Sequence, residues 1–172
     1  MIASVAYTDP FGLCYDKQTK EARACKVTWS EANHSNRNVS TATMRMVQGI
    51  ADRANVDLTL SSGRRQGSCA ASLHNCGTAV DISAINGHDI GQMINGVGVT
   101  NPSAMPFVNQ VQSVMKTMPD IRENYGPAGL FESKSASGGA QVQIYDDALQ
   151  NAHNDHVHAG GQRYLQDEDT GP

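Results

Sequence analysis

Apolar residues recur with two different periods along the chain, and these periods predict two helices and several short strands. Between residues 39 and 55 the apolar positions are three and four residues apart, which predicts a helix capped by Ser40 or Thr41. A second stripe of the same period begins at residue 104 or 105 and continues to residue 118, where Pro119 ends it. We expect this second stripe to pack into the core.

Alternation of apolar and polar residues predicts the strands. Residues 56–60 alternate and predict a half-buried strand. Residues 79–83 predict another strand, with Val80 and Ile82 on one face and Asp81 on the other. Weaker patterns predict further strands at residues 121–125, 142–145 and 155–159.

The segments between these elements show no clear period. Residues 1–37 are expected to be irregular, and residues 86–106 mostly loop, with a short helix near residues 89–93. Residues 133–139 are rich in Ser and Gly and predict a flexible loop or hairpin tip. Sixteen glycines in the chain also favour a loop-rich fold over a helical bundle.

Length and composition bound the class of protein. A chain of 172 residues indicates one domain, and 39% hydrophobic with 17% charged residues indicates a globular one. The net charge of −4 argues against a nucleic-acid partner, which usually demands a basic excess. No apolar run approaches the roughly 20 residues of a membrane span, so we expect no membrane insertion. The first residues lack the pattern of a secretory signal, so work outside the cytoplasm would need another route of delivery.

Four cysteines leave three alternatives open. Cys14, Cys25, Cys69 and Cys76 could form two disulfides, in any of three pairings. Cys69 and Cys76 lie on either side of His74, so a bridge between them would hold the loop that carries this histidine. The same two thiolates could instead bind a metal, or all four thiols could be buried and unrelated.

Histidines and one aspartate form the most informative pattern in the chain. His153, His156 and His158 fall within six residues, and His74 precedes Asp81 by seven. Imidazole and carboxylate groups together suit Zn²⁺, which in catalytic sites keeps three protein ligands and an open fourth position.

Strand geometry suggests how these groups meet. If residues 155–159 are extended, His156 and His158 point to one face, and Asp155 and Val157 point to the other. One histidine could then bind the metal while its neighbour accepts a proton. Asp81 faces away from the core in its own strand, so it could converge on the same ion.

These residues resemble a known family. Ser72, His74, Gly77, Ala79 and Asp81 stand in the order SxHxxGxAxD, and HxH follows near the C-terminus. The double motif is similar to that of the LAS group of zinc peptidases, which includes lysostaphin-type, D-alanyl-D-alanine carboxypeptidase-type and hedgehog-type domains. The additional histidine in HxxHxH is most similar to penicillin-insensitive murein endopeptidases. The resemblance implies an α+β fold, in which helices flank a small antiparallel sheet.

The resemblance also implies roles for individual residues. His74, Asp81 and His158 would bind Zn²⁺. His156 would be the general base, with His153 as a second group that handles protons or stabilises the transition state. Carboxypeptidase-type members have a glutamate at the position of Asp155, so the base stays open between Asp155 and His156, and the strand-face argument favours His156.

The segment before the first motif adds two substrate-binding candidates. Ser62, Gly63 and Arg64 resemble the SGYR turn of the carboxypeptidase branch, with Arg65 next to them. By this resemblance Arg64 and Ser72 would hold a carboxylate or carbonyl oxygen of the substrate. Arg64 would also help to hold negative charge during the reaction.

The N-terminus carries a second resemblance. Residues 9–13 read DPFGL, similar to the DPxGL motif at the end of Rhs-repeat cores, which variable toxin domains follow. This implies that residues 1–13 end such a core or form a leader, and that residues 14–172 are the peptidase domain. It further implies an antibacterial effector that a secretion apparatus, such as the type VI system, delivers to the periplasm of a target cell, and an immunity protein in the producer.

Three functions therefore compete. We expect a zinc-dependent peptidase that hydrolyses stem peptides or cross-links of peptidoglycan. A metal-dependent nuclease toxin is the first alternative, and the acidic balance of the chain argues against it. A zinc-bearing binding domain without activity is the second, and the presence of His156 and Arg64 argues against it.

Overall fold

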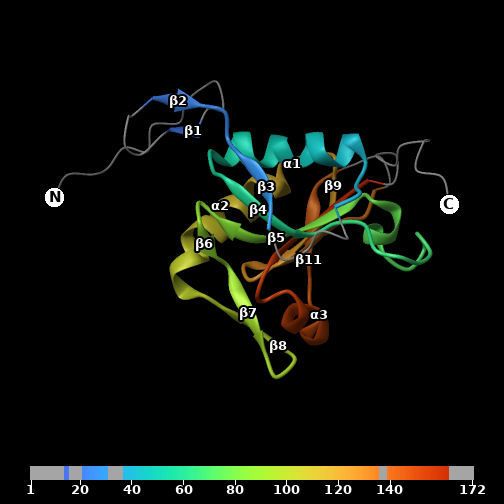
Figure 1. Ribbon diagram of the computed structural model, residues 1–172. Helices are drawn as coiled ribbons and strands as arrows, with labels where there is room; N and C mark the ends of the chain where they lie inside the picture. The colour runs from blue at the N-terminus through green and yellow to red at the C-terminus, as the bar shows by residue number, and fades with distance from the viewer. Residues whose placement is uncertain (1–13, 16–20, 31–36, 136–138, 163–172) are drawn as a thin grey trace.

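The computed structural model describes residues 14–15, 21–30, 37–135 and 139–162. Within these ranges the chain forms a mixed α/β domain around a mostly antiparallel sheet, with three α-helices (Figure 1). The expected α+β class is confirmed at this level. Residues 1–13, which we assigned to the end of an Rhs core or to a leader, lie outside the described residues.

One large sheet organises the domain. Its strands follow the order β11-β10-β9-β12-β5-β4-β3, and β6 pairs with β5 beside this path. All pairs are antiparallel except β3 with β4, which is parallel. The strands are β3 (Val27–Trp29), β4 (Leu58–Ser62), β5 (Ala79–Ile85), β6 (His88–Asp89), β9 (Ile121–Gly126), β10 (Gly129–Ser133), β11 (Gln141–Ile144) and β12 (Val157–Gly161). A separate two-stranded pair, β1 (Cys14–Tyr15) with β2 (Ala22–Arg23), precedes them.

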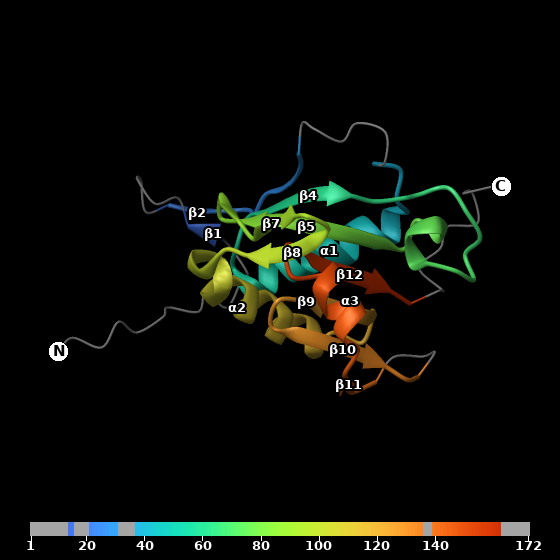
Figure 2. The same ribbon diagram turned by 90° about the horizontal axis from the view of Figure 1, so that it is seen from below.

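Two helices cover one face of the sheet and a third lies on the other. α1 (Thr41–Ala54) and α2 (Met105–Lys116) pack together and against β12. α3 (Asp147–Ala152) and the hairpin of β7 (Gly91–Ile94) and β8 (Val97–Thr100) lie on the side away from α1 (Figures 1 and 2). The short 3-10 helices are η1 (Leu73–Cys76) and η2 (Pro102–Ala104). None of the described helices has the length and apolar run that crossing a bilayer requires.

The core lies between the sheet and the helix pair α1–α2. Both predicted helices are confirmed, and Ser40 caps α1 by accepting a hydrogen bond from the Thr43 backbone. Their apolar stripes meet fully buried strand residues such as Ile82 and Val157. Because Val157 pairs with Ile82 across β12 and β5, the next pair in register, His158 with Asp81, faces the opposite side of the sheet.

The predicted strands at residues 56–60, 79–83, 121–125, 142–145 and 155–159 correspond to β4, β5, β9, β11 and β12, with ends shifted by up to two residues. The expectation of an irregular segment over residues 1–37 missed β1, β2 and β3. Two further elements, β10 and α3, carried no prediction at all. They are short, and the burial of their apolar residues depends on packing against neighbouring strands, which a local sequence pattern does not specify.

The prediction of a loop with a short helix at residues 86–106 is wrong. This segment instead forms β6, β7 and β8, and two tight turns of Asn followed by Gly connect the strands. Asn86 and Asn95 have φ of 52° and 51°, and the glycines after them also have positive φ. Such turns are the strongest short-range signal for a hairpin. The frequent Gly and Asn that suggested loop are therefore the turn residues of two hairpins.

A candidate metal centre on the open face of the sheet

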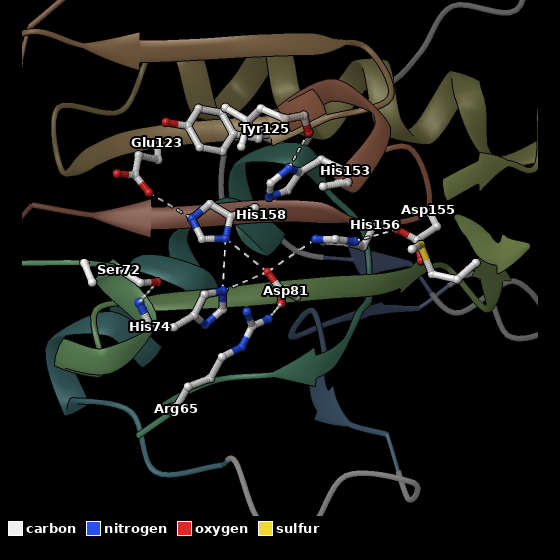
Figure 3. A pocket seen from close by; sticks show the side chains of 14 residues that line it. Arg65, Ser72, His74, Asp81, Glu123, Tyr125, His153, Asp155, His156 and His158 are labelled. Carbon is white, nitrogen blue, oxygen red and sulfur yellow. Dashed lines mark hydrogen bonds and ion pairs between the residues drawn. The ribbon is translucent and has the colours of Figure 1, made fainter. Parts of the chain in front are cut away.

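Three buried side chains meet on the face of the sheet opposite α1 and α2 (Figure 3). His74 comes from η1, Asp81 from β5 and His158 from β12. Oδ1 of Asp81 lies 3.0 Å from Nε2 of His74 and 3.0 Å from Nδ1 of His158, and the two nitrogens are 3.1 Å apart. The three residues are at most 4% exposed. This is the set of metal ligands that the sequence predicted, and it can hold a metal ion.

The outer hydrogen bonds of the two histidines aim their lone pairs at one point. Nδ1 of His74 lies 2.6 Å from the Gly63 carbonyl oxygen, which can only accept, so Nδ1 donates and Nε2 faces the centre as an acceptor. Nε2 of His158 donates in the same way to Glu123 Oε2 at 3.1 Å, which leaves Nδ1 towards the centre. Two imidazole lone pairs and one carboxylate oxygen therefore converge. Such a donor set fits a divalent cation, and metal-binding histidines are typically held by these outer partners.

The charges of the site also favour a cation. Burial alone lowers the pKa of His158, but hydrogen bonds with Asp81 and Glu123 outweigh burial and raise that pKa to about 9. Burial alone raises the pKa of Asp81, but its interactions with His158 and His74 outweigh burial and hold that pKa well below its ordinary value. A proton thus takes the place of the cation in the metal-free protein, and metal binding must displace it.

Local structure fixes the position of His74. Ser72 caps η1, and its hydroxyl accepts a hydrogen bond of 3.3 Å from the His74 backbone N–H. Gly77 ends η1 with φ of 70°, a conformation that favours glycine. A disulfide joins Cys69 to Cys76 at the end of η1, and a second joins Cys14 to Cys25. The bridge that would hold the His74 loop is therefore present, and the alternatives of thiolate ligands or unrelated thiols are not.

A second group of side chains approaches the same point from the segment between α3 and β12. Nδ1 of His156 donates to Oδ1 of Asp155 at 2.8 Å, and Nε2 of His156 lies 3.6 Å from Oδ1 of Asp81 (Figure 3). β12 begins only at Val157, so both residues precede the strand. Asp155 does not point away from the site as the strand-face argument expected; it lines the pocket and orients the ring of His156.

His153 lies beside this pair. Its Nδ1 donates to the Leu149 carbonyl at 2.7 Å, and its ring centroid is 4.9 Å from that of His156 and 5.6 Å from that of His158. Burial lowers the pKa of His153 to about 4. The imidazole is therefore neutral at neutral pH, and Nε2 is its acceptor atom.

The two neighbouring arginines differ in position. Arg65 lines the pocket, and its guanidinium donates to Oδ2 of Asp81 at 2.6 Å while half of its side chain stays exposed. Arg64, the arginine that the sequence analysis selected, is not among the lining residues. Ser72 does line the pocket. The structure thus brings Ser72 and Arg65 to the site and leaves Arg64 outside it.

Sequence reasoning missed two residues of β9. Glu123 holds His158, and the Tyr125 ring stacks on His158 with 5.5 Å between centroids. The Tyr125 hydroxyl donates to Glu132, and burial together with this bond raises the pKa of Tyr125 above its ordinary value. Both β9 residues lie on the face of His158 because β9 pairs with β12, a contact between strands over 30 residues apart.

All these groups line one open pocket of about 530 Å³, a size typical of small-molecule and peptide sites. Apolar side chains complete its rim: Ala71, Met93, Leu149 and Ala152. The three candidate metal ligands, each at most 4% exposed, are also among its lining residues. A ligand in the pocket would therefore reach the open side of the three ligands.

Comparisons of the chain with protein-family models, with curated proteins and with solved structures found no match. Any functional assignment therefore depends on the geometry and chemistry of the site.

Proposed function

We propose that the protein is a zinc-dependent peptidase of the LAS type that hydrolyses peptide bonds in the stem peptides or cross-links of peptidoglycan. The convergence of His74, Asp81 and His158 beneath an open pocket carries this proposal. Two imidazoles and one carboxylate are a ligand set used by catalytic zinc, which keeps one position open for water or substrate. A zinc ion held there would lower the pKa of a water molecule bound to it and would polarise the carbonyl group of a substrate.

His156 is suited to accept the proton of the attacking water. Its Nδ1 donates to Asp155, so Nε2 is an acceptor, and it lies on the pocket side 3.6 Å from the Asp81 carboxylate. A carboxylate that orients an imidazole and stabilises its charged form is the arrangement of acid–base catalysis in many hydrolases. Asp155 therefore acts through His156, and this supports His156 over Asp155 as the base.

Arg65 is placed to donate to the oxygen of the scissile carbonyl, whereas the neutral His153, whose Nε2 is an acceptor, is placed to take up a proton. The guanidinium of Arg65 enters the pocket from one side of Asp81 and keeps donors to spare, because only two of its five N–H groups are engaged, with Asp81 Oδ2 and Ser62 Oγ. His153 lies on the other side, next to His156 and His158. Fixed positive charge or donors near a developing oxyanion lower the barrier of acyl transfer.

The composition of the pocket supports a peptide over a nucleic acid. Asp81, Glu123 and Asp155 line it, and among the described lining residues Arg65 is the one Lys or Arg. Even with a bound Zn²⁺ the lining has no excess of positive charge, which a phosphodiester backbone needs and an uncharged peptide bond does not.

The proposal extends to an antibacterial effector that a secretion apparatus delivers to the periplasm, with an immunity protein in the producing cell. The DPFGL segment before the domain and the two disulfides, which persist in oxidising compartments, support this extension.

The test is to incubate the zinc-loaded protein with purified peptidoglycan and to identify the soluble fragments by mass spectrometry. We expect fragments from cleavage of one type of peptide bond, and none with Asp81→Asn or after chelation. Cleavage of nucleic acid with no release of peptide fragments would overturn the proposal, as would zinc binding without any hydrolysis.

A further inference from the structure

The β7–β8 hairpin packs against the segment that carries the proposed base, and it does so through backbone. In its register Gly91 pairs with Thr100 and Met93 with Gly98, so these four residues share one face of the hairpin. Met93 on this face lines the pocket. Gly98 on this face is buried although Met93 is 53% exposed, and the other face includes Ile94, Val97 and Val99, which are more than 40% exposed. The hairpin therefore has an inner face, towards the site, and an outer face, towards solvent.

Two glycines make the close approach of the inner face possible. A Cβ atom on Gly98 would lie 2.7 Å from the Asn151 carbonyl oxygen and 3.1 Å from the backbone nitrogens of Asn154 and Asp155. A Cβ atom on Gly91 would clash with the Val99 carbonyl oxygen within the hairpin and would lie 2.8 Å from the Asp155 Cα. Real Cβ atoms essentially never come this close to backbone atoms, so any side chain at these positions would push the two segments apart.

A hydrogen bond joins the two segments at the same place. The hydroxyl of Thr100 donates to the Asn154 carbonyl oxygen at 2.6 Å. Residues 153–156 lie between α3 and β12 and belong to neither element. The hairpin supports this short segment just where Asp155 and His156 turn into the pocket.

We propose that the β7–β8 hairpin is a positioning element, in which Gly91, Gly98 and the Thr100 hydroxyl fix the Asp155–His156 pair relative to the metal ligands. The hairpin packs against the segment that carries His156, the proposed base. None of the three candidate metal ligands lies on the hairpin. Loss of the contacts between the hairpin and this segment should therefore lower turnover without weakening metal binding. This inference rests on the proposed function for its catalytic consequence, but the placement of residues 153–156 can be measured without any reaction.

The first experiment compares Thr100→Val with Thr100→Ser. Valine has nearly the shape of threonine and lacks the donor, whereas serine retains it. We expect Thr100→Val to lower kcat by roughly 10- to 100-fold with KM and zinc affinity unchanged, because small displacements of catalytic groups cost this much. Thr100→Ser should restore most of kcat. Thr117→Val is the matched control, since Thr117 donates to the Val114 carbonyl at 2.7 Å far from the site, and it should leave kcat unchanged.

The second experiment compares Gly98→Ala with Gly49→Ala. A methyl group on Gly49 would meet only the end of the Met118 side chain, at 3.5 Å. Gly98→Ala should lower kcat at least as much as Thr100→Val, while Gly49→Ala should not lower it. If Gly98→Ala fails to fold, the pair of Thr100 variants decides the question.

Hydrogen–deuterium exchange separates this inference from the proposed function. In the full-length, zinc-loaded protein, Thr100→Val should speed exchange in a peptide covering residues 147–157, and Thr100→Ser and Thr117→Val should not. This result would support the positioning role even if the wild-type protein cleaved no peptide. Unchanged exchange with unchanged kcat in Thr100→Val would overturn the inference, and so would a loss of kcat that Thr100→Ser does not restore.

Discussion

The Cys69–Cys76 disulfide should couple the redox state of the protein to its affinity for metal. Replacing both cysteines by alanine frees the loop before η1, which carries His74. In the chain-entropy account, a bridge with a sequence separation of 7 stabilises the folded state by about 2.4 kcal/mol, and the Cys14–Cys25 bridge, with a separation of 11, by about 2.8 kcal/mol. The two double variants should therefore lose similar amounts of stability to unfolding by urea.

Only the first double variant should lose metal affinity. If the freed loop is ordered again when metal binds, the cost of ordering weakens binding by up to the same ~2.4 kcal/mol, or about 60-fold. The Cys14–Cys25 bridge joins β1 to residues before β3, away from the three ligands, so its removal should leave zinc affinity unchanged. Competition with a chromophoric chelator measures both affinities. Equal zinc affinity in the two variants would refute the coupling and would mean that hydrogen bonds alone hold η1.

Three further predictions concern single side chains of the site. His156→Ala should lower kcat by about 10²- to 10⁴-fold while zinc stays bound, and Asp155→Ala should cost less; the reverse order in a peptidoglycan-cleavage assay would make Asp155 the base. Arg65→Ala should reduce kcat/KM by on the order of 100-fold and Arg64→Ala by little, since Arg65 alone lines the pocket; equal losses would contradict the placement of these side chains. Glu123→Gln should weaken zinc binding by roughly 10- to 100-fold, measured by the same chelator competition, and an unchanged affinity would show that Glu123 does not orient His158.

The sequence predicted the three side chains that meet in the buried cluster, because the motifs that resemble those of the LAS peptidases name them. His74 and Asp81 lie on one short segment, and the strand period places Asp81 and His158 opposite the apolar residues beside them. The choice of Arg64 over Arg65 shows the limit of such reasoning. Neighbouring residues in a turn point in different directions, and the turn geometry after β4 decides which of them reaches Asp81.

Glu123 and Tyr125 could not have been found from the chain alone. Their role depends on β9 lying next to β12, and no local pattern specifies which strands pair across long separations. The β7–β8 hairpin was missed for a different reason. Its two Asn-Gly turns are visible in the sequence, but the glycines that suggested loop include Gly91 and Gly98, which are needed for close packing on the segment of the base.

The register of β12 links the metal centre to the hydrophobic core. Val157 and His158 are neighbours in sequence. Val157 is fully buried and pairs with Ile82, whereas His158 pairs with Asp81 on the opposite face. A shift of β12 by one residue would exchange these faces, which would bring His158 into the core and Val157 to the metal centre. The buried carboxylate of Asp81 favours the observed register further, because only there does His158 join His74 and Arg65 as its partners. Loss of the His158 partner from a carboxylate at 4% exposure would be destabilising. The same hydrophobic pattern that forms the core thus also places the ligands, and metal binding should add to the stability of this one register.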